Sequence, residues 1–372
     1  MTLLRHLAVA AVFAAAAVIL SFQLSYFHEY QLAEVAAYLV AIAGLTVLVG
    51  TSGQISIGHG AFMAIGGYAT ALVLGHWHWP LALVLVASVV VAAAIGAVVG
   101  VAAARLRGPY LAGATLMLAV ALPSLAISYA GMFGGDQGLP VNITTPSWLG
   151  AAFPPTRWLA WVTWAAALIA LVLLANVVHS RIGRSWRAVR DDEVAAALAG
   201  LNVARLRVLA FVISAACAGL AGALLVVTTN IASPGEFTLA LSITLLAGAV
   251  LGGLGSIAGA LWGSLVLVFL PVYLSDVAAS HGLGSAVSSN LPIAVYGAVL
   301  IVVMLLFPGG IQGAVRWLLG LPGFPRRPVT PGTPPPAGGP GTADTPGAVR
   351  TRRASLARRA PPGSQHQEEG TP

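Results

Sequence analysis

The chain contains little charge and almost no cysteine. Only 8% of its 372 residues are charged, and all 18 basic residues are arginine. Because soluble domains carry about 25% charged residues, this composition excludes an ordinary soluble globular protein. With a single cysteine, Cys217, the chain cannot form an intrachain disulfide. The same count excludes a CxxC redox motif and a metal site built from several cysteines.

Apolar residues dominate instead. They make up 58% of the chain, and the mean hydropathy is +0.90. Several runs approach or exceed the ~20 apolar residues that cross a bilayer. We therefore predict an all-α, polytopic transmembrane helical bundle with about ten crossings (roughly 8–11). The expected spans are residues 7–27, 32–50, 60–76, 80–104, 110–131, 158–178, 207–229, 238–252, 256–275 and 290–307.

The arginines lie where cytoplasmic loops are expected. The net charge is +7, but the positive residues occupy short loops and the C-terminal region, as the positive-inside rule requires. This distribution argues against a nucleic-acid partner and predicts that both termini are cytoplasmic. The outer loops then contain the acidic residues Glu29, Asp136, Glu236 and Asp276. Arg157 is the one exception, because this topology places it outside.

The two ends of the chain differ in character. Residues 7–27 are expected to be the first span, although a positive start before an apolar core also fits a cleaved signal peptide. Residues 1–321 form the predicted transmembrane domain. Residues 322–372 are rich in Pro, Gly and Arg, which predicts a disordered cytoplasmic tail. That tail is expected to be solvated, or else attracted to anionic membrane lipid by about 1 kcal/mol per arginine.

Glycine interrupts an apolar segment in each half of the chain. Irregular backbone at membrane depth persists only where it is buried in protein or lines a cavity, and paired broken segments indicate a translocation pathway. Close helix packing through small residues is the alternative. The polar side chains among them are expected to face protein or water, not lipid. The pathway candidates are Gly53, Gln54, Ser56, Gly58, His59 and Gly60 in the first half, and Gly252, Gly253 and Gly255 in the second.

Ionisable side chains are expected to be nearly absent from the spans. His59 is the main candidate, and no intramembrane carboxylate is expected. Proton- and sodium-coupled transporters usually need such carboxylates. The energy for transport is therefore expected to come from another protein, unless the chain is a passive pore. The sequence also shows no nucleophile–base pair, metal-ligand spacing or phosphate-binding motif, so we expect no catalytic residue, no metal and no cofactor of its own.

One internal loop, residues 180–207, is densely charged. Four arginines and three acidic residues lie between positions 181 and 193. A helical conformation would place Glu193, Ala196 and Gly200 on neighbouring turns of one face, where small side chains could fit a groove of a soluble partner. A solvated cytoplasmic loop that merely obeys the positive-inside rule is the alternative.

The segment 183–202 resembles the coupling loop, or EAA motif, of bacterial ABC-importer permeases. Further blocks resemble the LivM-type permease subunit of the branched-chain amino-acid importer family, at residues 53–68, 105–112, 134–139 and 250–263. The resemblance implies a coupling helix that docks on an ATPase. The residues that it assigns to this contact are Arg184, Arg187, Arg190, Asp191, Glu193, Ala195, Ala196 and Gly200.

The resemblance also implies partners and a location. A LivM-type subunit is expected in the bacterial inner or plasma membrane, together with a LivH-type permease, two cytoplasmic ATPase subunits and an extracytoplasmic solute-binding protein. ATP and Mg would be bound by the ATPase subunits. Branched-chain or related small amino acids would cross by alternating access. The same architecture could instead move urea, short amides or another small neutral solute, and a stand-alone channel is the remaining alternative.

Overall fold

The computed structural model describes residues 2–23, 25–77, 79–106, 108–143, 153–280, 285–307 and 309–319, which all belong to the unit Met1–Gly323. The predicted tail, residues 322–372, lies outside the described residues.

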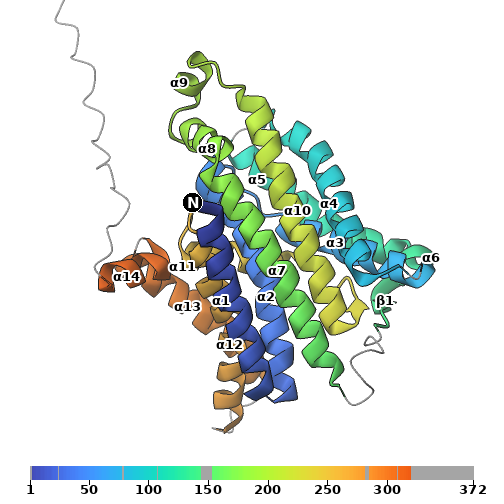
Figure 1. Ribbon diagram of the computed structural model, residues 1–372. Helices are drawn as coiled ribbons and strands as arrows, with labels where there is room; N and C mark the ends of the chain where they lie inside the picture. The colour runs from blue at the N-terminus through green and yellow to red at the C-terminus, as the bar shows by residue number, and fades with distance from the viewer. Residues whose placement is uncertain are drawn as a thin grey trace, which may run out of the picture. The chain divides into compact units, whose positions relative to one another are not determined.

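Figure 1 shows an assembly of helices. Its elements are α1 (Thr2–Gln23), α2 (Tyr26–Thr46), the π-helical η1 (Val47–Thr51), α3 (His59–His76), α4 (Leu81–Ala103), α5 (Pro109–Ser128), α6 (Ala130–Phe133), the 3-10 helix η2 (Gly135–Gln137), β1 (Leu139–Pro140), α7 (Pro155–His179), α8 (Arg181–Asp191), α9 (Glu193–Leu198), α10 (Val203–Thr229), β2 (Ile231–Ala232), α11 (Leu239–Gly252), α12 (Ile257–Ser280), α13 (Ser285–Leu306) and α14 (Gly310–Leu318).

The predicted polytopic helical bundle is confirmed. Among the described residues, seven helices are long and apolar enough to cross a membrane, or eight if the pair Ala294–Leu306 and Gly310–Leu318, bent by 49°, forms one span. Each of the expected spans corresponds to a helix. The count of full crossings is lower than ten because α11 has only 14 residues, and the 18-residue α3 begins and ends in histidine and contains three internal glycines besides Gly60.

Helix α10 is the centre of the bundle and packs against α2, α3 and α4. Glycine allows the close crossing with α3. A Cβ atom built on Gly66 would lie 2.0 Å from the Gly219 carbonyl oxygen, and one built on Gly222 would lie 1.9 Å from the Met63 carbonyl oxygen. Membrane helices approach this closely through small residues. The backbones of α3 and α10 are therefore in direct contact at this crossing.

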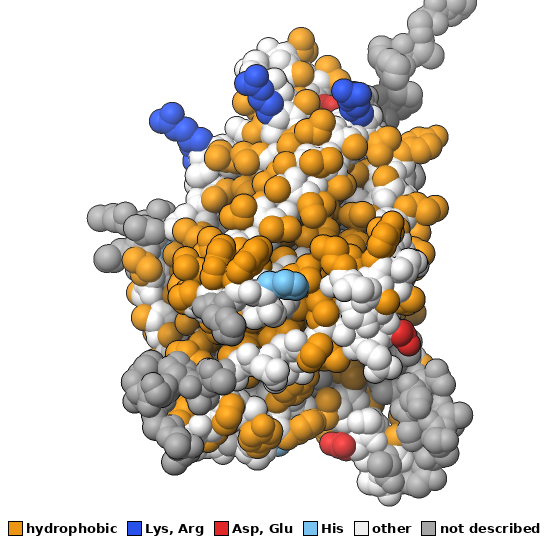
Figure 2. All heavy atoms as spheres, turned by 90° about the vertical axis from the view of Figure 1, so that its right-hand side faces the viewer, with side chains coloured by type: hydrophobic (Ala, Val, Ile, Leu, Met, Phe, Trp, Pro, Cys, Tyr) orange, Lys and Arg blue, Asp and Glu red, His pale blue; other side chains and the backbone are white. Residues whose placement is uncertain are grey.

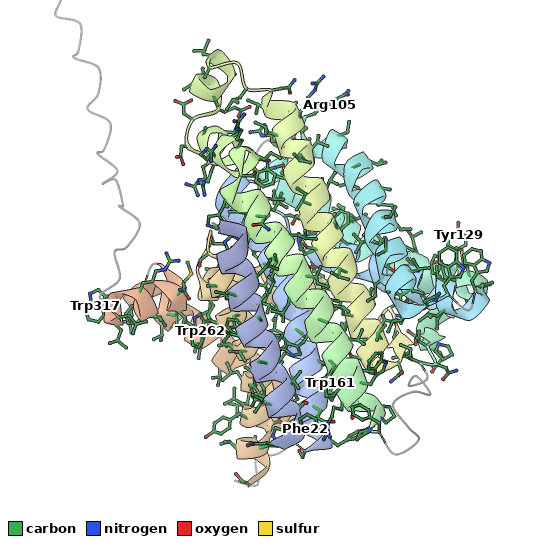
Figure 3. All side chains as sticks on the ribbon, viewed as in Figure 1. Phe22, Arg105, Tyr129, Trp161, Trp262 and Trp317 are labelled. Atoms are coloured by element: carbon green, nitrogen blue, oxygen red, sulfur yellow. The ribbon has the colours of Figure 1, made fainter. Side chains whose placement is uncertain are left out.

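Charge defines the two ends of the bundle. Arginine side chains gather at the end that carries α8 and α9, above a broad apolar surface (Figure 2). Arg105 lies at this same end, and the Phe22–Trp161 aromatic pair, with ring centroids 6.0 Å apart, lies far from it (Figure 3). By the positive-inside rule the α8–α9 end is cytoplasmic. The start of α1 lies there too, since His6 Nδ1 is 2.9 Å from Asn176 Oδ1 near the end of α7.

Arg157, the arginine predicted on the outer side, has a buried partner. Its Nε donates to Glu29 Oε1 at 2.8 Å, and the hydroxyl of Thr156 donates to Glu29 Oε2 at 3.0 Å. The Glu29 side chain is only 2% exposed. A carboxylate buried this far requires a charged or hydrogen-bonding partner, so the exception to the positive-inside pattern is an ion pair that joins α2 to α7.

The expectation that the spans contain no carboxylate is wrong. The second span extends over Tyr26–Thr51 and includes Glu34 as well as Glu29. Glu34 lies in the third turn of α2 and its side chain is partly exposed within the bundle. The span begins at Tyr26, about six residues earlier than the hydropathy of the sequence indicates. The charge of Glu29 can lie at this depth because Arg157 pairs with it.

We predict that Gly66→Val strongly destabilises the protein, whereas Gly75→Val in the same helix does not. A Cβ at Gly75 would meet nothing within 4 Å, unlike one at Gly66. Overpacking of a tight contact costs about 1–3 kcal/mol or more. Thermal unfolding of the two variants, purified identically in detergent, measures the difference. Equal melting temperatures would show that the α3–α10 crossing tolerates a side chain.

Candidate functional site

The charged loop contains two short helices and not one. The Ser180 hydroxyl oxygen accepts from Ile182 N at 3.1 Å at the start of α8, and Asp192 Oδ1 accepts from Val194 N and Ala195 N, both at 2.9 Å, at the start of α9. Such side-chain caps begin helices. Gly200 lies beyond the end of α9 with φ +86°, and Leu201 N donates to the Ala196 carbonyl at 3.1 Å, as in a glycine-terminated helix.

The structure differs in two respects from the helical face that was predicted for Glu193, Ala196 and Gly200. Gly200 is not a member of the helical face but the residue that ends the helix. Ala196 is buried, with 5% exposure, and so faces the interior of the protein, unlike its exposed neighbours on α9. Arg184, Asp191 and Ala195 are exposed, whereas Arg187 and Glu193 are partly buried. The arginines of α8 thus occupy different environments, which sequence spacing alone did not distinguish.

Helix α8 is anchored to the bundle by a tryptophan. Trp186 is 1% exposed, and its Nε1 donates to the Leu206 carbonyl of α10 at 2.9 Å. A second link joins α9 to α10, where Arg207 Nη2 lies 2.8 Å from Glu193 Oε2. Both groups of this ion pair are less than one-third exposed. These contacts attach the α8–α9 segment to α10, the central helix of the bundle.

Arg190 connects α8 to the first interrupted segment. At the end of α2 the chain becomes π-helical over η1, Val47–Thr51. The Arg190 guanidinium donates to the carbonyl oxygen of Gly50 in this turn, and its other nitrogens bind Asp191 Oδ1 at 2.9 and 3.2 Å. Gly53 follows with φ +73°, and a Cβ there would lie 2.8 Å from Arg190 Cγ. Glycine is required at this position for both reasons.

The polar residues of the first interruption are buried in the protein interior. Gln54 Nε2 donates to the Arg207 carbonyl at 3.1 Å, and His59 Nε2 lies 2.9 Å from Ser214 Oγ, so both side chains contact α10. Gly60 N donates to Ser242 Oγ of α11 at 2.9 Å. The side chain of Ser56 is 0% exposed, and a Cβ on Gly58 would lie 2.5 Å from the Thr115 carbonyl oxygen of α5.

The second interruption meets the first. A Cβ on Gly50 would lie 2.2 Å from Gly255 N, so these two backbones are in contact. Within the second interruption, Gly252 packs equally closely on Gly259, and Gly253 on the Gly309 carbonyl. We name residues 47–60 and 252–259, together with Arg190, the junction. The nine predicted pathway residues all lie in it, and close packing accounts for most of its glycines. Whether they line a solute pathway stays a prediction.

Two apolar side chains of α9 were missed by the sequence analysis. Val194 is 69% exposed and Leu198 is 85% exposed. They are four residues apart and therefore neighbours on one face of the helix. Figure 1 shows α9 projecting at the cytoplasmic end of the bundle. The signal was present in the sequence as two branched apolar residues among alanines and charges, but only the buried position of Ala196 identifies the outward face.

We predict that Arg190→Ala loosens the first interruption. The substitution leaves the Gly50 carbonyl without its charged donor, and such a hydrogen bond contributes about 1.5–3 kcal/mol. Hydrogen exchange of the purified protein should become roughly tenfold faster or more in residues 47–56 and stay unchanged in α10. Arg184→Ala is the matched control, because Arg184 is exposed on the same helix. Identical exchange in both variants would contradict the link between α8 and the junction.

The comparisons with known proteins agree with this architecture. The family model for the permease component of the branched-chain amino acid transport system matches residues 27–307. The high-affinity branched-chain amino acid permease protein LivM of Salmonella typhimurium is 35% identical over 260 residues, which cover 62% of this chain and 60% of LivM. LivH of Escherichia coli is 29% identical over 294 residues, covering 74% of this chain and 91% of LivH.

A sugar permease is also related. The ribose import permease RbsC of Escherichia coli is 30% identical over 239 residues, covering 62% of this chain and 72% of RbsC. No solved structure matches the chain significantly. The family match covers well over half of the sequence and includes α2 to the end of α13, with the whole junction and both short helices. The chain is therefore a multi-pass membrane protein that belongs to the family of branched-chain amino acid transport permease components.

Proposed function

We propose that the chain is the transmembrane subunit of an ABC importer for branched-chain or related small amino acids. Family membership supports this assignment. The observation that carries it is α9, which presents Val194 and Leu198 to the cytoplasm while its neighbour α8 is joined to the bundle. Exposed apolar side chains at a charged surface are typical of a protein contact. A transport subunit that depends on a cytoplasmic motor requires such a contact.

The motor must be supplied by other subunits. The chain has no lysine and so cannot contain the phosphate-binding lysine motif of an ATPase. ATP and Mg would be bound by two cytoplasmic ATPase subunits. A second permease of the LivH type would complete the membrane part, and an extracytoplasmic solute-binding protein would deliver the amino acid. The chain itself would catalyse no bond-breaking step.

Coupling follows from the contacts of α8. Closure of the ATPase pair on ATP would displace α9 and α8 as a rigid body. Trp186 and Arg207 pass this displacement to α10, and Arg190 passes it to Gly50 at the junction. Because α3 and α11 begin or end at the junction, their orientation would change between outward-open and inward-open states. Such rigid-body transitions are a common form of alternating access.

The direct test is reconstitution of the four kinds of subunit in liposomes. ATP-dependent accumulation of radiolabelled leucine, abolished when either the ATPase or the binding protein is omitted, supports the importer. Leucine entry that proceeds equally without ATP would instead identify a channel. ATP-dependent uptake of urea or a short amide with no uptake of leucine would retain the importer and exclude the amino-acid substrate.

We predict that Leu198→Glu uncouples the subunit without unfolding it. A charge at this 85%-exposed position disrupts no internal contact, but a buried, unpaired carboxylate at a protein interface costs several kcal/mol. ATP-driven uptake should fall at least tenfold, and the ATPase subunits should no longer co-purify with the permease. The control is Arg181→Glu, because Arg181 is exposed at the start of α8 and this substitution also introduces a negative charge. Normal uptake by Leu198→Glu would exclude α9 as the docking helix.

A further inference from the structure

Helix α2 carries a polar stripe in the outer half of the bundle. From Glu29 to Thr46 every residue of α2 is buried except Tyr30, Leu32, Glu34 and Tyr38. The three polar members are spaced at i, i+4 and i+8, so they share one face of the helix. Tyr30 and Glu34 lie one helical turn apart on this face, so the hydroxyl and the carboxyl group are neighbours. A partly exposed carboxylate and two tyrosines inside a membrane helix are expected to face a cavity or partner and not lipid.

A second carboxyl group lies near this stripe. Glu236 belongs to the segment between β2 and α11, and it interacts electrostatically with Glu34 and with the Tyr68 hydroxyl of α3. Burial, and then the proximity of Glu34, raises the pKa of Glu236 to about 7. Helices α2 and α3 and the β2–α11 segment thus bring two carboxyl groups and three tyrosines together.

Two polar atoms of this cluster lack partners among the described residues. They are Glu236 Oε2 and the hydroxyl oxygen of Tyr68, although the Tyr68 side chain is only 4% exposed. The Tyr68 ring is fixed by Phe133 and Phe237, with ring centroids 5.2 and 6.3 Å away. A buried hydroxyl without a hydrogen bond is energetically unfavourable. Both atoms therefore have hydrogen-bonding capacity that the described residues do not use.

Among the described residues, the cluster has no positively charged partner. In the described part of the chain, no arginine forms an ion pair with Glu34 or Glu236. Arg157, which lies toward the outer end, is already paired with Glu29 at 2.8 Å. Two neighbouring carboxyl groups in a protein interior cannot easily both ionise unless a cation lies between them. Glu236, whose pKa is raised, relieves the repulsion by binding a proton when no cation is present, whereas a small cationic group that approaches both carboxyl groups would allow both to ionise.

We propose that Glu34 and Glu236, with Tyr68, bind the ammonium group of a zwitterionic amino acid during its passage through the outer half of the permease. Tyr30 and Tyr38 add aromatic faces, which attract cations. This inference rests on the proposed function and refines its substrate class. A solute without a cationic group, such as urea, a short amide or a sugar, would leave both carboxyl groups uncompensated.

The test uses the purified importer complex without its binding protein, in constant sodium. Its melting temperature is measured with leucine, with 4-methylpentanoate, which lacks the amino group, and with isoamylamine, which lacks the carboxylate. Leucine and isoamylamine should raise the melting temperature by a few degrees, because ligands stabilise the state that they bind. 4-Methylpentanoate should not. Glu34→Gln and Glu236→Gln should lose the shift, and Glu34→Asp should retain part of it.

Asp136→Asn is the matched control, since Asp136 is an exposed acid in η2. This variant should keep the leucine shift. The inference is overturned if wild type shows no shift, if 4-methylpentanoate acts as well as leucine, or if the two glutamine variants respond like wild type. ATP-dependent leucine uptake by the complete wild-type system is measured alongside. If that uptake is absent, the importer assignment itself fails, which is a separate result.

Discussion

The carbonyl oxygen of Gly50 is the group on which the cytoplasmic half of the structure depends. Where α2 becomes π-helical, regular hydrogen bonding ends inside an apolar bundle. A backbone carbonyl released at such a place must be satisfied within the protein. Arg190 satisfies it from outside the bundle. The hydrogen bond from Arg190 satisfies the Gly50 carbonyl where the helix breaks, and it also attaches α8 to the interior of the bundle.

Helix α2 extends this connection across the membrane. It runs from the junction to the outer stripe of Tyr30, Glu34 and Tyr38 without interruption. Its 21 residues span roughly 30 Å at 1.5 Å per residue, about the thickness of the hydrocarbon core. A rigid helix of this length would transmit a displacement at Gly50 to Glu34. The junction, to which Arg190 links the α8–α9 segment, and the proposed ammonium site would then lie toward opposite ends of the same span.

Hydropathy and charge predicted much of this architecture. Each expected span corresponds to a helix, and the arginine-rich loops lie at one end, because both properties follow from the cost of transferring side chains into lipid. The sequence did not predict the partner of Arg157, since Glu29 is 128 positions away. It did not place the break at Asp192 either, because a single capping carboxylate divides an otherwise continuous helical pattern.

The candidate site was predicted less completely than the fold. The glycine-rich segments were identified by their composition, but their contact through Gly50 and Gly255 depends on tertiary packing. Ala196 was expected on the docking face and is buried, whereas Val194 and Leu198 are exposed. Glu34 was overlooked because one carboxylate hardly changes the hydropathy of a long span. Residue types identified the charged loop and the glycine-rich segments as functional candidates. Only the burial of individual side chains distinguished the outward face of α9 from its inward face.

The most direct test of this account measures two distances by electron spin resonance in the reconstituted importer. Spin labels on Ala197 of α9 and Ile55 of the junction, both exposed, report whether these parts move together. A second pair, Ala197 and Tyr129, reports movement relative to the outer end of α5. The account predicts that ATP binding changes the second distance and leaves the first unchanged. A change of several ångströms between Ala197 and Ile55 on ATP binding would contradict a rigid link through Arg190.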